Sequence, residues 1–180
     1  MSKRKVTLHE LRGLVANYNV FFESLKEAFV NRERIIDLMK YATAQRHHLL
    51  VFGPPGTSKT AISDMAMAGI TGAKTFQIEL SMFMTEDNVF GPYDPKKMRE
   101  DGLLFHNTEN MLPEANVARF GEFLDPNMAL LRSLLGVLNE RQLRRGRQIL
   151  KIPLYTVYCD TNKDPYEILK NSPYLWAVLD

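Results

Sequence analysis

The chain has 180 residues and a formal net charge of +2, and 45% of its residues are hydrophobic and 24% charged. This balance is typical of a globular domain that buries a core, and so small a charge gives no reason to expect a nucleic-acid partner. A single cysteine, Cys159, excludes an intramolecular disulfide framework, and no apolar stretch approaches the roughly 18 residues of a membrane-spanning helix.

The amino-terminal region predicts a flexible tail followed by helices. Residues 1–14 are basic and lead into no apolar signal segment, so we expect a flexible tail and a cytoplasmic protein. From Val15 to Ala44 the apolar residues recur at helical spacing, and the polar stretch Val30–Arg34 divides this region into two helices. The short apolar run Leu49–Gly53 that follows is typical of a buried parallel strand.

Three further strands are predicted downstream, separated by helices. Their expected ranges are Lys74–Leu80, Asn116–Phe123 and Leu154–Asn162. We expect a helix after the first strand with Gly69 as its C-cap, and a later helix capped by Asp125 with Pro126 in its first turn. Strands that alternate with helices favour an α/β fold with a mostly parallel sheet.

Two segments do not fit this alternation. Ser81–Pro113 is polar and contains many turn residues, yet it is too long for a structureless loop in a compact domain. Arg141–Pro153 has the pattern of a β-hairpin that turns at Gly146. It carries the arginines Arg141, Arg144, Arg145 and Arg147. We expect them on a solvated hairpin, and contacts with a neighbouring subunit's nucleotide or with nucleic acid are the alternatives.

The stretch VFGPPGTSKT, residues 51–60, follows the first predicted strand and has the pattern of a phosphate-binding loop. Its backbone amides and the positive end of the following helix are suited to hold a β-phosphate. Lys59 is expected to bridge the β- and γ-phosphates of ATP, and the Thr60 hydroxyl to bind Mg²⁺. A chance proline–glycine turn before a helix is the alternative. The predicted loop residues are Gly53, Pro54, Pro55, Gly56, Thr57, Ser58, Lys59 and Thr60.

Ser58 departs from this pattern, because a glycine usually precedes the lysine. The position contributes a backbone N–H to the phosphate rather than a side chain. We expect a small side chain to be tolerated there if the backbone is helical, since a positive φ is unfavourable for any residue other than glycine.

An enzyme with such a loop also needs a carboxylate near Mg²⁺ and a group that orients the attacking water. Glu122 lies near the end of the predicted strand Asn116–Phe123 and is the candidate to polarise water. The alternative is that Glu122 is only an exposed carboxylate at a strand end. Asn162 ends the last strand, where it can contact the γ-phosphate or the water, or only form a turn. Gly121 stands where an aspartate is expected, which weakens the predicted hold on the metal. Asp125 is a candidate replacement, and its role as a helix cap is the favoured interpretation.

From about Phe29 to Asp180 the chain resembles the MoxR-type AAA+ ATPases, and among them the RavA-like branch. The resemblance rests on GPPGTSKT, FMTEDNVFGPYDPKKMREDG, LPEA and LLGVLNERQLRRG, and on the strand that ends at Asn162. That branch also accepts a small residue other than glycine before the lysine. The resemblance implies a P-loop NTPase (AAA+) three-layer sandwich with a mostly parallel central sheet and a helical amino-terminal segment. It further implies that Ser81–Pro113 is a β-hairpin insertion facing a ring pore.

The resemblance also implies functional roles for single residues. Gly53, Gly56, Lys59 and Thr60 would be the Walker A residues, Glu122 the Walker B glutamate and Asn162 the sensor asparagine. ATP and Mg²⁺ are the implied cofactors. The implied assembly is a ring, expected to be a hexamer, that acts on a protein client or a von Willebrand-type partner.

Two departures from the family pattern affect this expectation. Members of the family have an aspartate before the Walker B glutamate, where this chain has Gly121. The sequence also ends at LWAVLD, before the arginine finger and the helical lid of such proteins. Residues 15–180 are therefore expected to form an AAA+ core without its lid.

Three functions are compatible with these features. The favoured one is an ATPase that remodels a protein partner in a ring. The second is a nucleotide-binding scaffold whose hydrolysis is impaired by Gly121, which predicts tight nucleotide binding without turnover. The third is an ATPase stimulated by nucleic acid through the arginine hairpin, which predicts a steep salt dependence of nucleic-acid binding.

Overall fold

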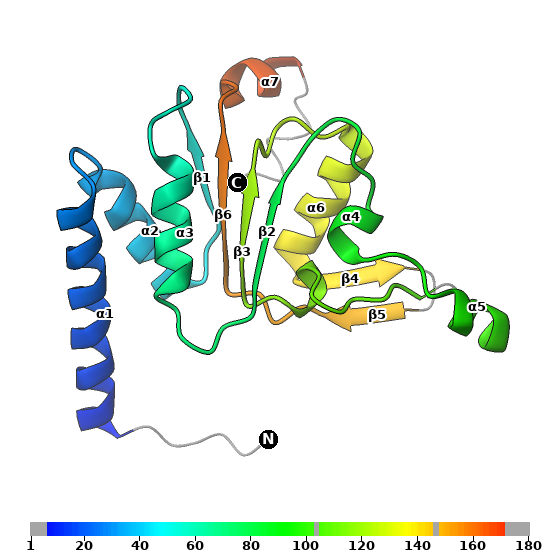
Figure 1. Ribbon diagram of the computed structural model, residues 1–180, viewed down its shortest axis with the longest axis horizontal. Helices are drawn as coiled ribbons and strands as arrows, with labels where there is room; N and C mark the ends of the chain where they lie inside the picture. The colour runs from blue at the N-terminus through cyan, green and yellow to red at the C-terminus, as the bar shows by residue number, and fades with distance from the viewer. Residues whose placement is uncertain (1–6, 103–104, 146–147, 172–180) are drawn as a thin grey trace.

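The computed structural model describes residues 7–102, 105–145 and 148–171. At its centre is a four-stranded parallel sheet in the order β1-β6-β3-β2 (Figure 1). The strands are β1 (Leu49–Phe52), β2 (Thr75–Glu79), β3 (Val117–Gly121) and β6 (Thr156–Thr161). Each strand lies within a stretch that the sequence predicts as one, and their parallel pairing confirms the predicted α/β class.

The parallel pairing brings the ends of separate strands to one place. Glu79, the last residue of β2, pairs with Gly121, the last residue of β3. The loop 53–60, Glu122 and Asn162 directly follow the ends of β1, β3 and β6. These segments therefore meet at the carboxyl edge of the sheet, where open α/β sheets bind their ligands.

Two helices form the amino-terminal region. They are α1 (Leu8–Ala28) and α2 (Glu33–Gln45), and the connection between them falls at the predicted break. The Thr7 hydroxyl accepts a hydrogen bond from Glu10 N at 3.2 Å, and the Glu10 carboxylate accepts one from Thr7 N at 2.8 Å. This capping box starts α1 at Leu8. The prediction of a flexible tail over residues 1–14 is therefore wrong for residues 8–14, which are helical.

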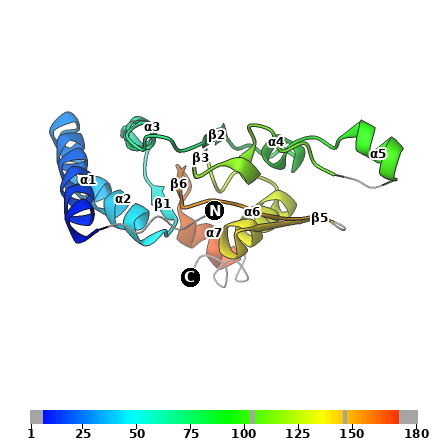
Figure 2. The same cartoon turned by 90° about the horizontal axis from the view of Figure 1, so that it is seen from below.

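Helices cover both faces of the sheet and produce three layers (Figure 2). One face is covered by α3 (Lys59–Ala68) with α1 and α2, and the other by α6 (Met128–Glu140). Side chains of the central strands alternate between the two cores. Phe120 and Cys159 pack on the α6 side, and Val117 and Tyr158 on the opposite side. The predicted three-layer P-loop sandwich is confirmed.

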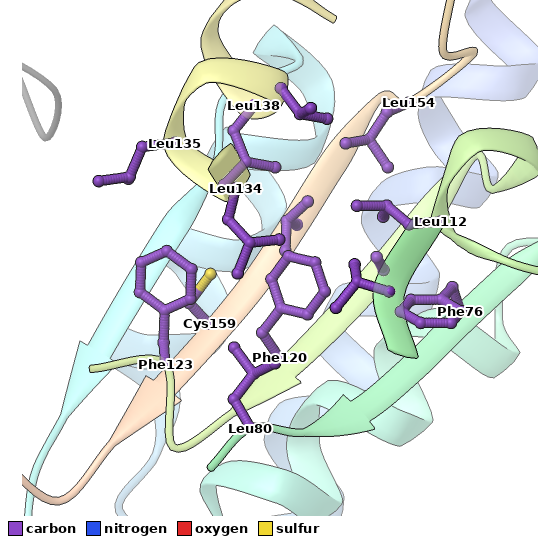
Figure 3. Packing of buried hydrophobic residues seen from close by; sticks show 14 of the residues in the cluster. Phe76, Leu80, Leu112, Phe120, Phe123, Leu134, Leu135, Leu138, Leu154 and Cys159 are labelled. Carbon is purple, nitrogen blue, oxygen red and sulfur yellow. The ribbon is translucent and has the colours of Figure 1, made fainter. Parts of the chain in front are cut away.

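The core under α6 anchors the end of β3 (Figure 3). Phe120 and Phe123 are both buried, and their rings stack with centroids 6.0 Å apart. Other members of this cluster are Phe76, Leu80, Leu112, Leu134, Leu135, Leu138, Leu154 and Cys159. Burial of each large side chain contributes about 1.5–3 kcal/mol. Because Phe123 is held in this way, Glu122 before it has a defined place at the sheet edge.

The segment Ser81–Pro113 differs from the expected β-hairpin insertion. It contains the short helices α4 (Asp87–Phe90) and α5 (Pro95–Asp101) and leads into the 3-10 helix η1 (Leu112–Glu114). Asp94 Oδ1 accepts a hydrogen bond from Lys96 N at 2.9 Å, and Pro95 opens α5, which favours a helix at this point. The antiparallel pairing within its described residues is an isolated bridge between Tyr93 and His106.

The region around α6 contains the predicted hairpin and a cap that differs from the prediction. β4 (Gln142–Arg145) and β5 (Gln148–Lys151) pair antiparallel, and Gly146 and Arg147 between them lie outside the described residues. The predicted cap Asp125 is wrong, because Asn127 caps α6 and accepts a hydrogen bond from Leu130 N at 3.1 Å. Pro126 consequently precedes the cap rather than lying in the first turn.

The last described element is α7 (Pro165–Asn171), which follows β6. The closing sequence LWAVLD, residues 175–180, on which the expectation of a missing lid rests, lies outside the described residues. Within the described part of the chain, no helix combines the length and the apolar character needed to cross a bilayer.

Candidate nucleotide-binding site

A cavity of about 560 Å³ lies at the carboxyl edge of the sheet. Its walls come from the loop between β1 and α3, from the start of α3, and from the ends of β2, β3 and β6. The lining residues are Pro55, Gly56, Thr57, Ser58, Lys59, Thr60, Ala61, Asp64, Glu79, Glu122, Asp160 and Asn162. The structure thus brings together the three residues for which the sequence predicts catalytic roles, Lys59, Glu122 and Asn162.

Lys59 is buried at this edge and has four neutral acceptors, of which the Thr57 hydroxyl at 3.4 Å is the most distant. Its Nζ donates to the carbonyl oxygens of Gly53 at 2.8 Å and Pro54 at 2.9 Å, and to Asn162 Oδ1 at 3.1 Å. A buried ammonium needs such acceptors in place of water. Since none of the four acceptors is charged, the site keeps a positive charge that is suited to a phosphate oxygen.

Glu122 and Asn162 form a hydrogen-bonded pair across two strand ends. Glu122 Oε1 accepts from Asn162 Nδ2, and Glu122 Oε2 accepts from Asn162 N at 3.3 Å. The Asn162 side chain therefore lies between a carboxylate and the Lys59 ammonium, which determines the orientation of its amide group. Glu122 has a φ of +49°, a left-handed conformation that is uncommon for a residue with a side chain and often marks functional sites.

Ser58 adopts a left-handed backbone conformation, with φ 62° and ψ 15°. The helical backbone under which a side chain is expected to be tolerated at this position is therefore not present. The Ser58 hydroxyl makes no capping hydrogen bond to α3 that would offset the conformation. A left-handed conformation costs a residue with a Cβ about 1–2 kcal/mol. Position 58 thus has a backbone conformation that favours glycine, although its residue is serine.

Replacing Ser58 by glycine should therefore stabilise the protein. We expect Ser58→Gly to raise the free energy of unfolding by about 0.5–1 kcal/mol, because the relieved strain exceeds the added freedom of the unfolded chain. Urea denaturation followed by circular dichroism measures this change. Ser58→Ala removes the hydroxyl but keeps the Cβ, so it serves as the control and should give no gain. Equal stabilities of the glycine and alanine variants would contradict the strain.

A buried arginine beside the cavity is a feature that the sequence analysis missed. Arg119 lies in β3, and its guanidinium contacts three carboxylates. These are Glu79 Oε1, Asp160 Oδ2 at 3.1 Å and Asp64 Oδ1 at 3.2 Å. Burial raises the pKa of the Asp160 carboxyl, and the charge of Arg119 opposes that effect. The available sequence signal was a charged residue inside the apolar run that forms β3.

Most of the chain matches a known protein family. The family model described as the MoxR domain in the MoxR-vWA-beta-propeller ternary systems matches residues 16–172. The chain belongs to this MoxR family. The part of the MoxR domain that the match covers includes the loop 53–60, Glu122 and Asn162.

Relatives of this MoxR domain come from an archaeon and a virus. The uncharacterized proteins MJ0812 and MJ0079 of Methanocaldococcus jannaschii are each 30% identical over 145 residues, which is 81% of this chain and 39% and 38% of those proteins. Structural protein ORF618 of the Acidianus two-tailed virus is 22% identical over 174 residues, 95% of this chain and 28% of that protein. The chain thus spans about two fifths or less of the length of these relatives.

The fold is also similar to a solved structure. It is the crystal structure of a "putative ATPase" from Cytophaga hutchinsonii, with a TM-score of 0.57 and 17% sequence identity. The similarity covers 85% of this chain and 47% of the other. At this identity the similarity concerns the fold of the MoxR domain.

Asp125, the predicted alternative metal ligand, lies elsewhere in the MoxR domain. Its Oδ1 pairs with Lys163 Nζ at 2.9 Å, and its backbone N donates to Glu122 O at 2.9 Å. It is not among the residues that line the cavity. Asp125 therefore closes the turn after Glu122, and the structure does not bring it to Thr60.

The described arginine side chains of the hairpin have structural partners. Arg141 Nε donates to Leu154 O at 3.0 Å, and its Nη2 donates to Tyr155 O at 3.2 Å. Burial lowers the pKa of Arg141. Arg144 Nε pairs with Glu140 Oε2 at 3.4 Å. Arg141 thus joins the hairpin to the segment before β6, and this arrangement gives no support to a nucleic-acid interface.

His48 connects β6 to α6 behind the loop. Its Nδ1 accepts from Val157 N at 3.1 Å, and its Nε2 lies 3.1 Å from Leu138 O, to which it donates. Both hydrogen bonds require a neutral ring that carries its proton on Nε2. Burial of the ring lowers the pKa of His48 below its ordinary value of 6.5.

The MoxR domain should therefore lose stability as the pH falls through about 6.5, the ordinary pKa of histidine. Below that pH the unfolded chain binds a proton at His48 that the folded chain does not, so acid favours unfolding. His48→Gln can still donate and accept but does not titrate, and it should reduce the fall of Tm between about pH 7.5 and pH 5.5. The exposed neighbour provides the control His47→Gln, which should retain the full fall. Equal pH dependence of both variants would contradict this role of His48.

Proposed function

We propose that this chain binds ATP with Mg²⁺ in the cavity and, within a ring assembly, hydrolyses it to ADP and phosphate. The observation that carries this proposal is the hydrogen-bonded series Lys59–Asn162–Glu122. It links a lysine suited to phosphate with a carboxylate suited to activate water, and the two come from different strand ends. The loop alone would support phosphate binding only. Membership of the MoxR family gives independent support.

Different residues would bind the phosphates, stabilise the transition state and activate the water. Backbone amides of residues 53–60 and the amino-terminal end of α3 would hold the β-phosphate. Lys59 would exchange its loop carbonyls for phosphate oxygens and stabilise the negative charge that develops in the transition state. Glu122 would orient the attacking water and accept its proton, and Asn162 would hold Glu122 in place. Mg²⁺, when bound, neutralises phosphate charge, and the Thr60 hydroxyl is a candidate ligand for it.

The partner that we propose is a von Willebrand-type domain, or a client that such a domain presents. The description of the family as the MoxR domain of MoxR-vWA-beta-propeller systems supports this class of partner. We propose a cytoplasmic hexamer in which a neighbouring subunit completes each site. Light scattering after gel filtration, with and without ATP, measures the assembly state, and a monomer under both conditions would contradict the ring.

A second candidate is a nucleotide-binding scaffold with impaired hydrolysis. Gly121 favours it, because this residue removes the carboxylate that such enzymes place before the catalytic glutamate. Affinity for a fluorescent ATP analogue and phosphate release from ATP, measured on one preparation, distinguish the candidates. Binding with turnover supports the ATPase, and binding without turnover supports the scaffold. If the chain binds no nucleotide, both are contradicted.

A further inference from the structure

The side-chain space next to Gly121 is occupied by a carboxylate from another strand. A Cβ built on Gly121 would lie 1.6 Å from Glu79 Oε2 and 2.4 Å from the Glu79 carboxyl carbon. Glu79 and Gly121 are register partners in β2 and β3, so their side-chain positions lie on the same face of the sheet. The glutamate carboxylate therefore fills the place where the side chain of an aspartate at position 121 would begin.

Arg119 holds this glutamate from the same face of β3. It precedes Gly121 by two residues, which in a strand places both on one side of the sheet. One end of its guanidinium contacts Glu79 Oε1, and the other contacts Asp160 Oδ2 at 3.1 Å. Glu79 Oε2, the oxygen nearest to Gly121, has no hydrogen-bond partner among the described residues. One oxygen is thus used to position the carboxylate, and the other is left for a ligand.

The charges around Arg119 do not balance. Three carboxylates, from Asp64, Glu79 and Asp160, contact one guanidinium. All three carboxylate residues line the cavity, together with Thr60. A wall with excess negative charge would repel the phosphates of free ATP, whereas a divalent cation between the wall and the phosphates would convert that repulsion into attraction.

The oxygen donors present fit Mg²⁺ in the way that nucleotide sites use it. Mg²⁺ binds to one or two protein oxygens and takes its remaining ligands from phosphates and water. Within the described residues, no group of three or more His, Cys, Asp or Glu side chains is arranged to hold a metal ion alone. A hydroxyl from Thr60 and a carboxylate from Glu79 agree with an ion that arrives with the nucleotide.

We propose that Glu79, positioned by Arg119, supplies the carboxylate that holds the Mg²⁺ of the nucleotide complex in place of the aspartate missing at position 121. The inference rests on the proposed nucleotide-binding function. In this arrangement the carboxylate that binds the metal comes from β2 instead of β3. Gly121 has no side chain and so leaves room for it. Glu122 keeps its separate role toward water.

The test measures affinity for a fluorescent ATP analogue in Mg²⁺ and in EDTA. The wild-type chain is expected to bind the analogue more tightly in Mg²⁺. Glu79→Gln keeps an acceptor for Arg119 but removes the charge, and it should lower the enhancement by Mg²⁺ about 10–100-fold, as losses of metal-positioning groups do. Its affinity in EDTA should not weaken. Glu114→Gln removes a carboxylate that pairs with Lys74 outside the cavity, and it should retain the enhancement.

A second test removes the carboxylate at position 79 in β2 and introduces one at position 121 in β3. The double variant Glu79→Ala with Gly121→Asp should recover the Mg²⁺ enhancement that Glu79→Ala loses. Gly121→Asp alone should not strengthen it, because the new side chain overlaps the Glu79 carboxylate. Full Mg²⁺ enhancement in Glu79→Gln, or an equal loss in Glu114→Gln, would overturn the inference while leaving the proposed function intact. If the wild type binds no nucleotide in either buffer, the proposed function falls and the inference with it.

Discussion

Lys59→Ala is expected to weaken the affinity of the chain for ATP by about 100-fold or more, whether or not Mg²⁺ is present. Hydrogen bonds between charged groups contribute about 1.5–3 kcal/mol each, and loss of two such bonds to phosphate oxygens corresponds to a factor of this size. The four acceptors that hold Lys59 are neutral, so the phosphates are the only anionic partners proposed for it. Titration calorimetry with ATP measures the change.

A matched control separates the loss of this lysine from the loss of any positive charge. Lys74 is exposed, pairs with Glu114 at 2.8 Å, and precedes β2 at the opposite end of that strand. Lys74→Ala should bind ATP like the wild type. Thermal unfolding verifies that both variants are folded. Unchanged ATP affinity in folded Lys59→Ala would remove the basis for a nucleotide site in the loop.

Glu122→Gln is expected to lower ATP turnover by about 10²–10⁴-fold while leaving nucleotide affinity nearly unchanged, because a general base acts in the chemical step and not in binding. The two Glu122 oxygens accept from Asn162 Nδ2 and Asn162 N. A glutamine has only one acceptor oxygen, so the variant also loosens the pair that orients the water-activating group.

The control for this variant is a neutralised glutamate away from the cavity. Glu114→Gln loses its contact with Lys74 but does not alter the cavity walls. Phosphate release at saturating ATP and the affinity for ATP are measured for both variants. If the wild type hydrolyses ATP well above background and Glu122→Gln is equally fast, Glu122 is not the catalytic base. If turnover in the wild type is itself no faster than background hydrolysis, the scaffold is favoured.

The features predicted correctly from the sequence are those encoded by neighbouring residues. Each strand of the sheet is a short apolar or alternating run, and the loop 53–60 carries its motif in consecutive positions. The prediction that Glu122 and Asn162 approach the loop needed one further fact, that parallel strands end at a common edge. Local pattern and a general rule were sufficient to predict that Lys59, Glu122 and Asn162 lie together.

The features that the sequence could not reveal depend on which strands are neighbours. Glu79 and Gly121 are 42 positions apart, and only the order of the sheet places the carboxylate of one over the backbone of the other. The displaced cap has a different cause. Asp125 and Asn127 are both good capping residues, and the hydrogen bond between Asp125 N and Glu122 O commits Asp125 to the preceding turn.

In the proposed reaction, the contact between Lys59 and Asn162 would affect the order of events. The Asn162 amide contacts both the Lys59 ammonium, which we propose binds phosphate, and the Glu122 carboxylate, which we propose activates water. A γ-phosphate that draws the Lys59 ammonium away from Asn162 would break their hydrogen bond. The Asn162 amide would then be free to change its hydrogen bond with Glu122. Arrival of substrate would then be sensed at the base before any chemistry occurs, so that water is activated only when there is a phosphate to attack.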